Sequence, residues 1–229
     1  CRYAGKGQSE LALLRGLMAT FRPGDILLAD RLMCSWREMA MLKARGVHIV
    51  TRLSAIRTAD FRRGKRLGKD DHIVEWPRPH LRSVALADES LPESLTVREV
   101  RVRVDRPGFR SKTIVVVTTL LDEDITVGDL AELYRARWHN ELDLRSLKQT
   151  LQMNVLRCKT PELSRKEIWT HLLAYNLIHT MMAQAADRHG YQPRTISFKG
   201  TVQTLEAFQT LIEAHGHRSP DARTILYEQ

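Results

Sequence analysis

The chain has 229 residues, enough for one elaborated domain or two small ones, and 43% of them are hydrophobic, which suffices for a sizeable core. Lysine and arginine total 36 against 27 acidic residues, and the formal net charge of +9 favours a polyanionic partner, most simply a nucleic acid. Three scattered cysteines, with no C-x-x-C pair, argue against a disulfide framework and a zinc finger and suit a reducing cytoplasm.

The first part of the chain follows the strand–helix–strand pattern of an α/β layer. Residues 8–21 have helical periodicity, and the unbroken apolar centre of residues 25–30 is typical of a strand buried on both faces. A helix over residues 35–46 then leads to a second buried strand over residues 47–53. This order predicts two parallel strands joined by a helix.

A basic, β-rich stretch is expected over residues 54–120. Strands are predicted over residues 72–76, 96–104 and 113–120, the last two as an antiparallel hairpin with one basic face. We expect this stretch to be an insertion that projects from the α/β layer and binds duplex DNA through its phosphates.

Helices resume at Thr126 and are expected to continue to about residue 152. Thr160 and Pro161 provide the N-cap and first position of a long helix that ends near Gly190, and a last helix is expected over residues 200–215. The most apolar long run, residues 168–186, contains two histidines, an asparagine and a glutamine, which predicts a buried helix rather than a membrane span.

One of these helices carries an unusual set of polar side chains in the stretch "YRARWHNELDLRSLK". On a helical wheel, Tyr134, Arg137, Glu141 and Lys148 lie within about 60° of one another, beside a sector of leucines that should pack on a core. Glu141 is the only carboxylate on this stripe. One acid among cations and a phenol suits a metal ion next to a phosphate, whereas the alternative is a helix with ordinary surface ion pairs.

A second acid, Asp30, ends the first buried strand, where open α/β sheets place their sites. A carboxylate there is costly unless it is exposed or binds a cation, although a helix-capping role is also common for aspartate. If the polar helix packs beside this strand, Asp30 and Glu141 would share Mg²⁺ ions about 3.5–4 Å apart. Arg137, Lys148 and the Tyr134 hydroxyl would then hold DNA phosphates.

The spacing Tyr134-x2-Arg137-x3-Glu141-x6-Lys148 resembles the signature of bacterial insertion-sequence transposases of the DDE class, the cut-and-paste type with a β-rich insertion before the last acid. The stretch "GDILLADR" resembles the strand that carries the second catalytic aspartate of that family, so the resemblance makes Asp30 the second acid and Glu141 the third. The stretches "LRCKTPE" and "HLLAYNLI" are similar to the family as well. The resemblance covers nearly the whole chain, and four residue types at fixed spacing make it specific.

The resemblance implies an α/β fold with a ribonuclease-H-like catalytic core. Residues 1–53 and 121–155 would form that core, which is N-terminally incomplete, residues 54–120 the basic β-rich insertion, and residues 156–229 a helical C-terminal region. The family also implies cleavage at the ends of the element and strand transfer into target DNA, with Mg²⁺ or Mn²⁺ as cofactor. The expected partner is double-stranded DNA, bound by a homodimer in the bacterial cytoplasm.

One departure from the family concerns its three carboxylates, the first of which lies on an earlier strand. Asp25 precedes Asp30 on the same strand and would lie roughly 17 Å from it, so it cannot take the place of the first acid. We therefore expect the first acid, its strand and any N-terminal DNA-recognition domain to be missing, and the chain to be the C-terminal portion of a transposase.

Two further residues receive assignments with open alternatives. Trp138 lies next to Arg137 and would stack on an unpaired base, as aromatic residues do in related transposases, or would be a core tryptophan. Arg31, next to Asp30, would reach a phosphate or pair with Asp30 itself.

Two other readings compete with a catalytic transposase. The chain would instead be a non-catalytic, DNA-binding remnant that dimerises with an intact transposase and inhibits it. It would otherwise be a structure-specific nuclease of the same fold, which hydrolyses DNA without strand transfer.

Overall fold

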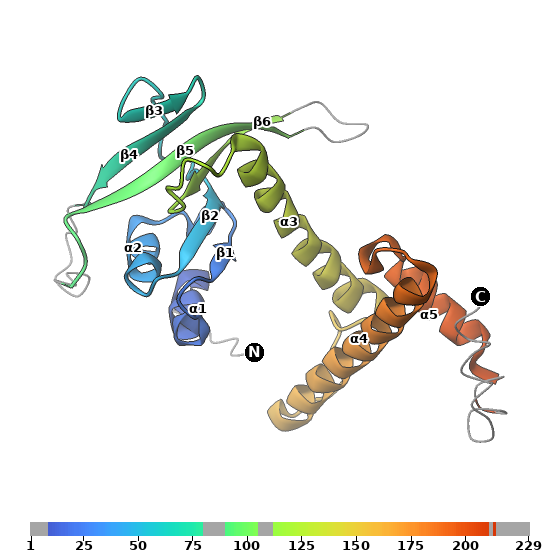
Figure 1. Cartoon of the computed structure of the whole chain (residues 1–229). Coiled ribbons are helices and arrows are strands. Elements are labelled where there is room, and N and C mark those ends of the chain that lie inside the picture. Colours follow the sequence, from blue (N-terminus) through green and yellow to red (C-terminus); the bar gives the residue numbers. More distant parts are fainter. Residues whose placement is uncertain (1–8, 80–89, 105–111, 211–212, 214–229) are drawn as a thin grey trace. The chain divides into compact units, whose positions relative to one another are not determined.

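The computed structural model describes residues 9–79, 90–104, 112–210 and 213 (Figure 1). The chain divides into two compact parts, an N-terminal part over Arg2–His139 and a C-terminal part over Asn140–Gln229. Within the described ranges, no helix combines the length and the apolar character that a membrane crossing requires.

A six-stranded sheet forms the centre of the N-terminal part. β1 and β2 are parallel, as the strand–helix–strand pattern predicts, and every other neighbouring pair is antiparallel. Along the sheet the order is β1-β2-β6-β5-β4-β3. The strands are β1 (Ile26–Leu28), β2 (His48–Arg52), β3 (Lys65–Gly68), β4 (Asp71–Pro77), β5 (Ser94–Val104) and β6 (Lys112–Thr118).

Helices cover both faces of this sheet because successive strand residues point to opposite sides. Ile49 and Val117 belong to the core under α1 (Glu10–Leu17) and α2 (Trp36–Ala44). Their neighbours Val50 and Val116 belong to the opposite core, into which α3 (Val127–Arg145) inserts Leu130. Short 3₁₀ helices, η1 (Met18–Thr20) and η2 (Arg31–Met33), follow α1 and β1. The predicted helices and strands of this part are therefore confirmed, apart from small shifts at their ends. The prediction that the first strand is buried on both faces is wrong, because β1 lies at the edge of the sheet and Ile26 is 43% exposed.

The β-rich stretch is continuous with the α/β layer, because β6 pairs with β2 through the partners Val50 and Thr118. The predicted antiparallel hairpin of β5 and β6 is confirmed. β3 was not predicted, because its sequence is basic and lacks alternating apolar residues. The division that treats residues 54–120 as a separate insertion remains a prediction.

The C-terminal part consists of helices. The long helix α4 (Pro161–His189) has the predicted N-cap, Thr160, whose hydroxyl accepts a hydrogen bond from the Leu163 N–H, and it ends at Gly190, which has a φ of 67°. A 3₁₀ helix, η5 (Pro193–Thr195), leads to α5 (Phe198–Ala207). The predicted end of the last helix at residue 215 lies outside the described residues.

The helix with the polar signature changes its winding after Arg145. A π-helix over Ser146–Thr150 continues α3 and buries Leu147. Lys148 lies in this π-helix, so the wheel of an ideal α-helix no longer describes its direction relative to Tyr134 and Arg137. π-turns of this kind occur frequently at functional sites.

Candidate functional site

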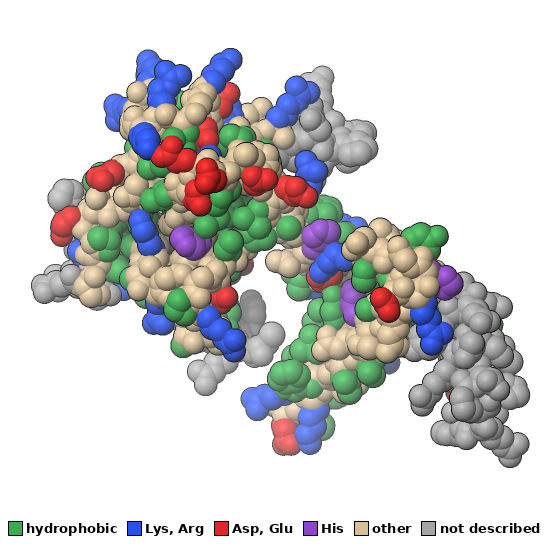
Figure 2. Space-filling model, in the orientation of Figure 1, with side chains coloured by type: hydrophobic (Ala, Val, Ile, Leu, Met, Phe, Trp, Pro, Cys, Tyr) green, Lys and Arg blue, Asp and Glu red, His purple; other side chains and the backbone are tan. Residues whose placement is uncertain are grey.

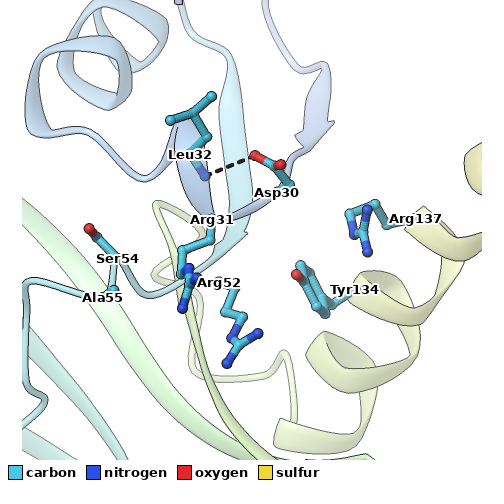
Figure 3. Close-up of a pocket in the computed structure, with 8 residues that line it drawn as sticks. All are labelled: Asp30, Arg31, Leu32, Arg52, Ser54, Ala55, Tyr134 and Arg137. Carbon is cyan, nitrogen blue, oxygen red and sulfur yellow. Dashed lines mark hydrogen bonds between the residues drawn. The ribbon is translucent and has the colours of Figure 1, made fainter. Parts of the chain in front are cut away.

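An open cavity of about 480 Å³ lies in the N-terminal part, at the end of β1 and beside α3 (Figure 3). Tyr134 and Arg137 extend from α3 toward the segment that carries Asp30. The cavity lies at the carboxyl ends of the parallel strands β1 and β2, the position at which open α/β sheets bind ligands. Its lining residues are Asp30, Arg31, Leu32, Arg52, Ser54, Ala55, Tyr134 and Arg137.

Backbone and side-chain contacts from β2 hold Asp30 in place. The Ala29 N–H donates to the Val50 carbonyl at 3.0 Å, and the Thr51 hydroxyl donates to the Asp30 carbonyl at 2.5 Å. The Asp30 side chain caps η2, because its Oδ1 accepts a hydrogen bond from the Leu32 N–H at 2.8 Å. A carboxylate has a second oxygen, so the cap leaves acceptor capacity in the cavity.

The start of α3 is equally well anchored. The Thr126 hydroxyl accepts from the Asp129 N–H at 3.1 Å, while an Asp129 carboxylate oxygen accepts from the Thr126 N–H at 2.8 Å, a reciprocal capping box. The Thr126 hydroxyl also donates to this carboxylate, and these hydrogen bonds lower the pKa of Asp129 below its usual value. Leu130 is fully buried one turn later. Tyr134 packs partly against the same core, so the cap and the core together set which face of α3 meets the cavity.

The charges of the cavity favour an anion. Three of its lining residues are arginines and only one, Asp30, is an acid. Arg31 and Arg52 form no salt bridge with another described residue. The Arg137 guanidinium lies 5.7 Å from the centre of the Tyr134 ring, so the two side chains act as one cationic and hydrogen-bonding surface. A phosphodiester matches this combination of cations and a phenol.

The structure brings together four of the residues that the sequence singles out. Asp30, Arg31, Tyr134 and Arg137 all line the cavity. Trp138 follows Arg137 on α3 and is half-buried, but it is not among the lining residues. The predicted approach of Glu141 and Lys148 to Asp30 remains a prediction, because those two residues belong to the C-terminal part.

Sequence reasoning missed Arg52 and Ser54. Arg52 is the last residue of β2, so it stands at the same edge of the sheet as Asp30, which follows the parallel strand β1 by two residues. The rule that sites occupy the carboxyl ends of parallel strands would have identified Arg52, had it been applied to the second strand as well as the first.

A polar cluster supports the helical turn of Glu141 within the C-terminal part. Asp143 accepts hydrogen bonds from both terminal nitrogens of Arg194, at 3.2 and 3.3 Å. Tyr175 and His179 of α4 lie beside this pair, and their rings stack against each other and against Phe198 of α5. This cluster joins the end of α3 to η5, α4 and α5.

The cluster perturbs its own titratable groups. Burial raises the pKa of Tyr175 to about 12, with the hydrogen bond to the Asp143 carboxylate acting in the same direction. Burial acts to raise the pKa of Asp143, but the hydrogen bonds from Arg194 and Tyr175 outweigh it and the pKa is lowered. The pKa of His179 is lowered, chiefly by burial, so the neutral imidazole is favoured.

Metal ligands are sparse in the part of the chain that the structure describes. No group of three or more histidine, cysteine, aspartate or glutamate side chains there is arranged to hold a metal ion. Within the cavity, Asp30 is the one carboxylate, exposed and with hard oxygen atoms of the kind that Mg²⁺ prefers.

Comparison with known proteins indicates the family to which the chain belongs. Residues 4–177 match the family model described as the transposase DDE domain. The transposase InsG for insertion sequence element IS4 of Escherichia coli (strain K12) is 32% identical over 171 residues, which make up 71% of this chain and 36% of InsG. The transposase for insertion sequence element IS421 of Escherichia coli is 33% identical over 82 residues, which make up 36% of this chain and 21% of that relative.

The region of this chain that matches InsG thus covers about a third of the length of InsG, and the match to the second relative covers a smaller share of that protein. The family match nevertheless covers most of this chain, from before α1 into α4, and includes the cavity with Asp30, Arg137 and Tyr134. The chain therefore belongs to the DDE transposases of bacterial insertion sequences.

Proposed function

We propose that this chain carries the part of a transposase that binds the ends of an insertion sequence and cuts and rejoins their DNA strands. The observation that carries the proposal is the cavity in which Asp30 meets Arg31, Arg52, Tyr134 and Arg137 at the carboxyl ends of two parallel strands. In this family the chemistry is phosphoryl transfer, which depends on positioning and on neutralising phosphate charge. The cations that surround Asp30 in the cavity suit the second part of that task.

The fold proposed for this site is the ribonuclease-H-like core expected from the resemblance. Within this chain β1, α2 and β2 would form one part of it, and α3 would bring the signature residues to it. The parallel pairing of β1 with β2 and the packing of α3 on the sheet through Leu130 support this assignment.

A divalent cation would be held by Asp30 together with Glu141, one helical turn after Arg137 on α3. Asp30 fits this role because it is exposed in the cavity and its cap to Leu32 uses only one of its carboxylate oxygens. When bound, Mg²⁺ or Mn²⁺ would activate the attacking oxygen and stabilise the leaving oxygen. A second carboxylate is required, because one aspartate is too few for either ion.

The remaining side chains would hold the DNA. Arg31, Arg52 and Arg137 would neutralise phosphates on either side of the bond to be broken, and the Tyr134 hydroxyl would donate a hydrogen bond to a phosphate oxygen. Lys148 would contact a neighbouring phosphate from the π-helix. Trp138 would stack on an unpaired base next to the cut.

The proposed partners are double-stranded DNA of the element ends and of the target, and a second copy of the protein on that DNA. Phosphate contacts supply most of the affinity of such complexes, and the net charge of +9 suits them.

Manganese binding tests the acid pair directly. Purified chain is titrated with Mn²⁺, and the free ion is followed by electron paramagnetic resonance. Asp30→Asn and Glu141→Gln should each abolish binding, because each removes one of the two carboxylates. Glu132→Gln is the matched control, since Glu132 is an exposed acid of the same helix that the signature stripe excludes.

The same preparations, together with an Arg137→Ala variant, are then titrated against a fluorescein-labelled DNA duplex. DNA binding that requires Arg137, without manganese binding, would support the alternative of a non-catalytic remnant that occupies DNA. If every variant still binds both Mn²⁺ and DNA as the unchanged chain does, the assignment of the cavity is overturned.

A further inference from the structure

A buried arginine on β5 links the sheet to the connection that leads into α3. The Arg98 side chain is 2% exposed, and its Nε and Nη2 donate to the two carboxylate oxygens of Asp71 on β4, at 2.9 and 2.7 Å. Its remaining terminal nitrogen, Nη1, donates to the backbone carbonyl of Asp122 at 2.8 Å. One guanidinium thus spans two strands and the β6–α3 connection.

The position of Arg98 follows from the strand periodicity. Leu95 and Val97 contribute to the core under α1 and α2, whereas Val100 and Val102 contribute to the core under α3. Arg98 has the parity of Val100 and Val102, so it points to the face on which α3 packs. A polar residue is therefore buried on the face that carries the signature helix.

The β6–α3 connection has further hydrogen bonds of its own. The Leu120 N–H donates to the Thr118 hydroxyl at 3.0 Å, and the Asp124 N–H donates to the Asp122 side chain at 3.0 Å. Glu123 forms a salt bridge with Lys65 of β3. The hydrogen bond from Arg98 to the Asp122 carbonyl ties this connection to the interior of the sheet.

The Arg98–Asp71 ion pair does not by itself account for the choice of these residues. Replacing a buried ion pair with apolar residues of similar size is often neutral or stabilising, so stability alone gives little reason to keep it. An apolar residue, however, cannot donate a hydrogen bond to the Asp122 carbonyl. The planar fork of arginine can satisfy a carboxylate on one side and a carbonyl on the other.

We propose that Arg98 is a positioning residue that fixes the β6–α3 connection and thereby the reach of Tyr134 and Arg137 into the cavity. The anchored segment runs from Asp122 through the Thr126 cap to the buried Leu130, one turn before Tyr134. The expected effect of Arg98 on DNA binding rests on the proposed function of the cavity. The expected effect of Arg98 on the backbone of the β6–α3 connection does not depend on that function.

The experiment removes the link while keeping a packed core. The double variant Arg98→Met/Asp71→Leu replaces the buried pair with apolar side chains, and its melting temperature reports whether the sheet remains intact. The matched control is Arg101→Met/Asp70→Leu, which removes an exposed Arg–Asp pair in the same β4–β5 region. Both doubles leave the net charge unchanged.

Hydrogen–deuterium exchange is the first measurement. We expect amides of residues 122–134 to exchange about fivefold faster or more in the Arg98/Asp71 double variant, with β4 and β5 still protected. The control double should leave residues 122–134 unchanged. If the double variant does not fold, Arg98→Lys replaces it, because lysine keeps the charge beside Asp71 but loses the fork that reaches Asp122. Unchanged exchange over 122–134 in a folded variant would overturn the proposal.

Affinity for a fluorescein-labelled DNA duplex is the second measurement. If Arg98 acts through α3, combining its double variant with Arg137→Ala should weaken binding no further than Arg137→Ala alone. A loss equal to the product of the two separate effects would show that Arg98 does not act through Arg137. If Arg137→Ala alone leaves the affinity unchanged, the proposed function of the cavity fails, whereas the exchange result still decides whether Arg98 holds the connection.

Discussion

Arg137 is one of two α3 residues that line the cavity, the other being Tyr134. It lies over the ring of Tyr134, one turn before Glu141 on the same helix, and it shares the cavity with Arg31 and Arg52. On the proposed function, a cation in that position would contribute to DNA binding through a phosphate, without reading sequence.

Arg137→Ala should therefore weaken binding of all duplexes by a similar factor and reduce the slope of log affinity against log salt by about 1. Arg135→Ala is the matched control, because Arg135 is exposed on another face of the same helix and changes the net charge equally. Fluorescence anisotropy over a range of salt concentrations measures both quantities. Equal salt slopes in the two variants would mean that Arg137 acts only through the overall charge of the chain, and not through a phosphate contact in the cavity.

Tyr175 and Asp143 provide a test of the C-terminal cluster by pH. The folded-state pKa of Tyr175, about 12, lies above the value of about 10 expected in the unfolded chain, so neutral Tyr175 stabilises the fold below pH 10. This stabilisation is lost as the pH rises from about 10 through about 12. The pKa of Asp143 is lowered, so its contribution is present above about pH 4 and is lost on further acidification.

Asp143→Asn should move the pKa of Tyr175 back toward its usual value, because the negative charge that opposes tyrosinate formation is gone. Ultraviolet absorbance of tyrosinate measures this titration, and Tyr175→Phe identifies the signal. Tyr191→Phe is the control, since Tyr191 is 66% exposed. A Tyr175 titration that Asp143→Asn leaves unchanged would mean that the two side chains are not coupled.

At the scale of elements, the β3 hairpin, defined as β3 and β4 with the preceding residues 60–64, presents a basic surface, and Figure 2 shows lysine and arginine side chains gathered over it. Their charges are not equally available. Arg62 and Arg63 pair with Asp60, and Lys65 pairs with Glu123. Of these four cations, Arg66 is exposed and forms no salt bridge with another described residue, which makes it the strongest of the four as a candidate for a phosphate contact.

Neutralising this hairpin should flatten the salt dependence of duplex binding, because fewer counterions are released. The variant carries glutamine at Arg62, Arg63, Lys65 and Arg66. A control with the same change in charge carries glutamine at four exposed cations of other elements, namely Arg22, Arg45, Lys166 and Lys199. If both variants show the same slope, the hairpin has no special role in binding DNA.

At the scale of the whole molecule, the number of carboxylates limits activity. A two-metal site holds both ions at a fixed separation, and Asp30 and Glu141 alone would leave one ion poorly held. A misplacement of reacting atoms by about 1 Å can cost roughly 10²-fold in rate.

We therefore predict that the 229-residue chain binds DNA but does not nick it. The assay incubates the purified chain with Mg²⁺ and a labelled duplex of an element end, and gel electrophoresis separates nicked from intact strands. Robust nicking that Glu141→Gln abolishes would show that another residue supplies the third ligand. Nicking that survives both Glu141→Gln and Asp30→Asn would place the chemistry elsewhere.

Local sequence patterns determined most elements of this protein. Apolar runs and helical periodicity predicted β1, α2 and β2, and the pair Thr160–Pro161 with Gly190 marked both ends of α4. These signals are local, since a cap or a buried strand needs only its own residues. The spacing from Tyr134 to Lys148 identified the family for the same reason, because one continuous stretch of chain, α3 and the π-helix that follows it, contains all four residues.

Contacts between distant segments decided the rest. β3 exists because it pairs with β4, and Gly64 at its start has a φ of 72°, where a Cβ would lie 2.1 Å from the Ile73 carbonyl oxygen. Arg52 entered the cavity only because β2 lies parallel to β1. In the sequence, Arg98 is one more cation of a basic strand. Its burial is possible because Asp71 and Asp122, which come from other parts of the chain, accept hydrogen bonds from its guanidinium. The energy of such a group depends on partners that its own segment does not contain, so only the tertiary structure could assign it.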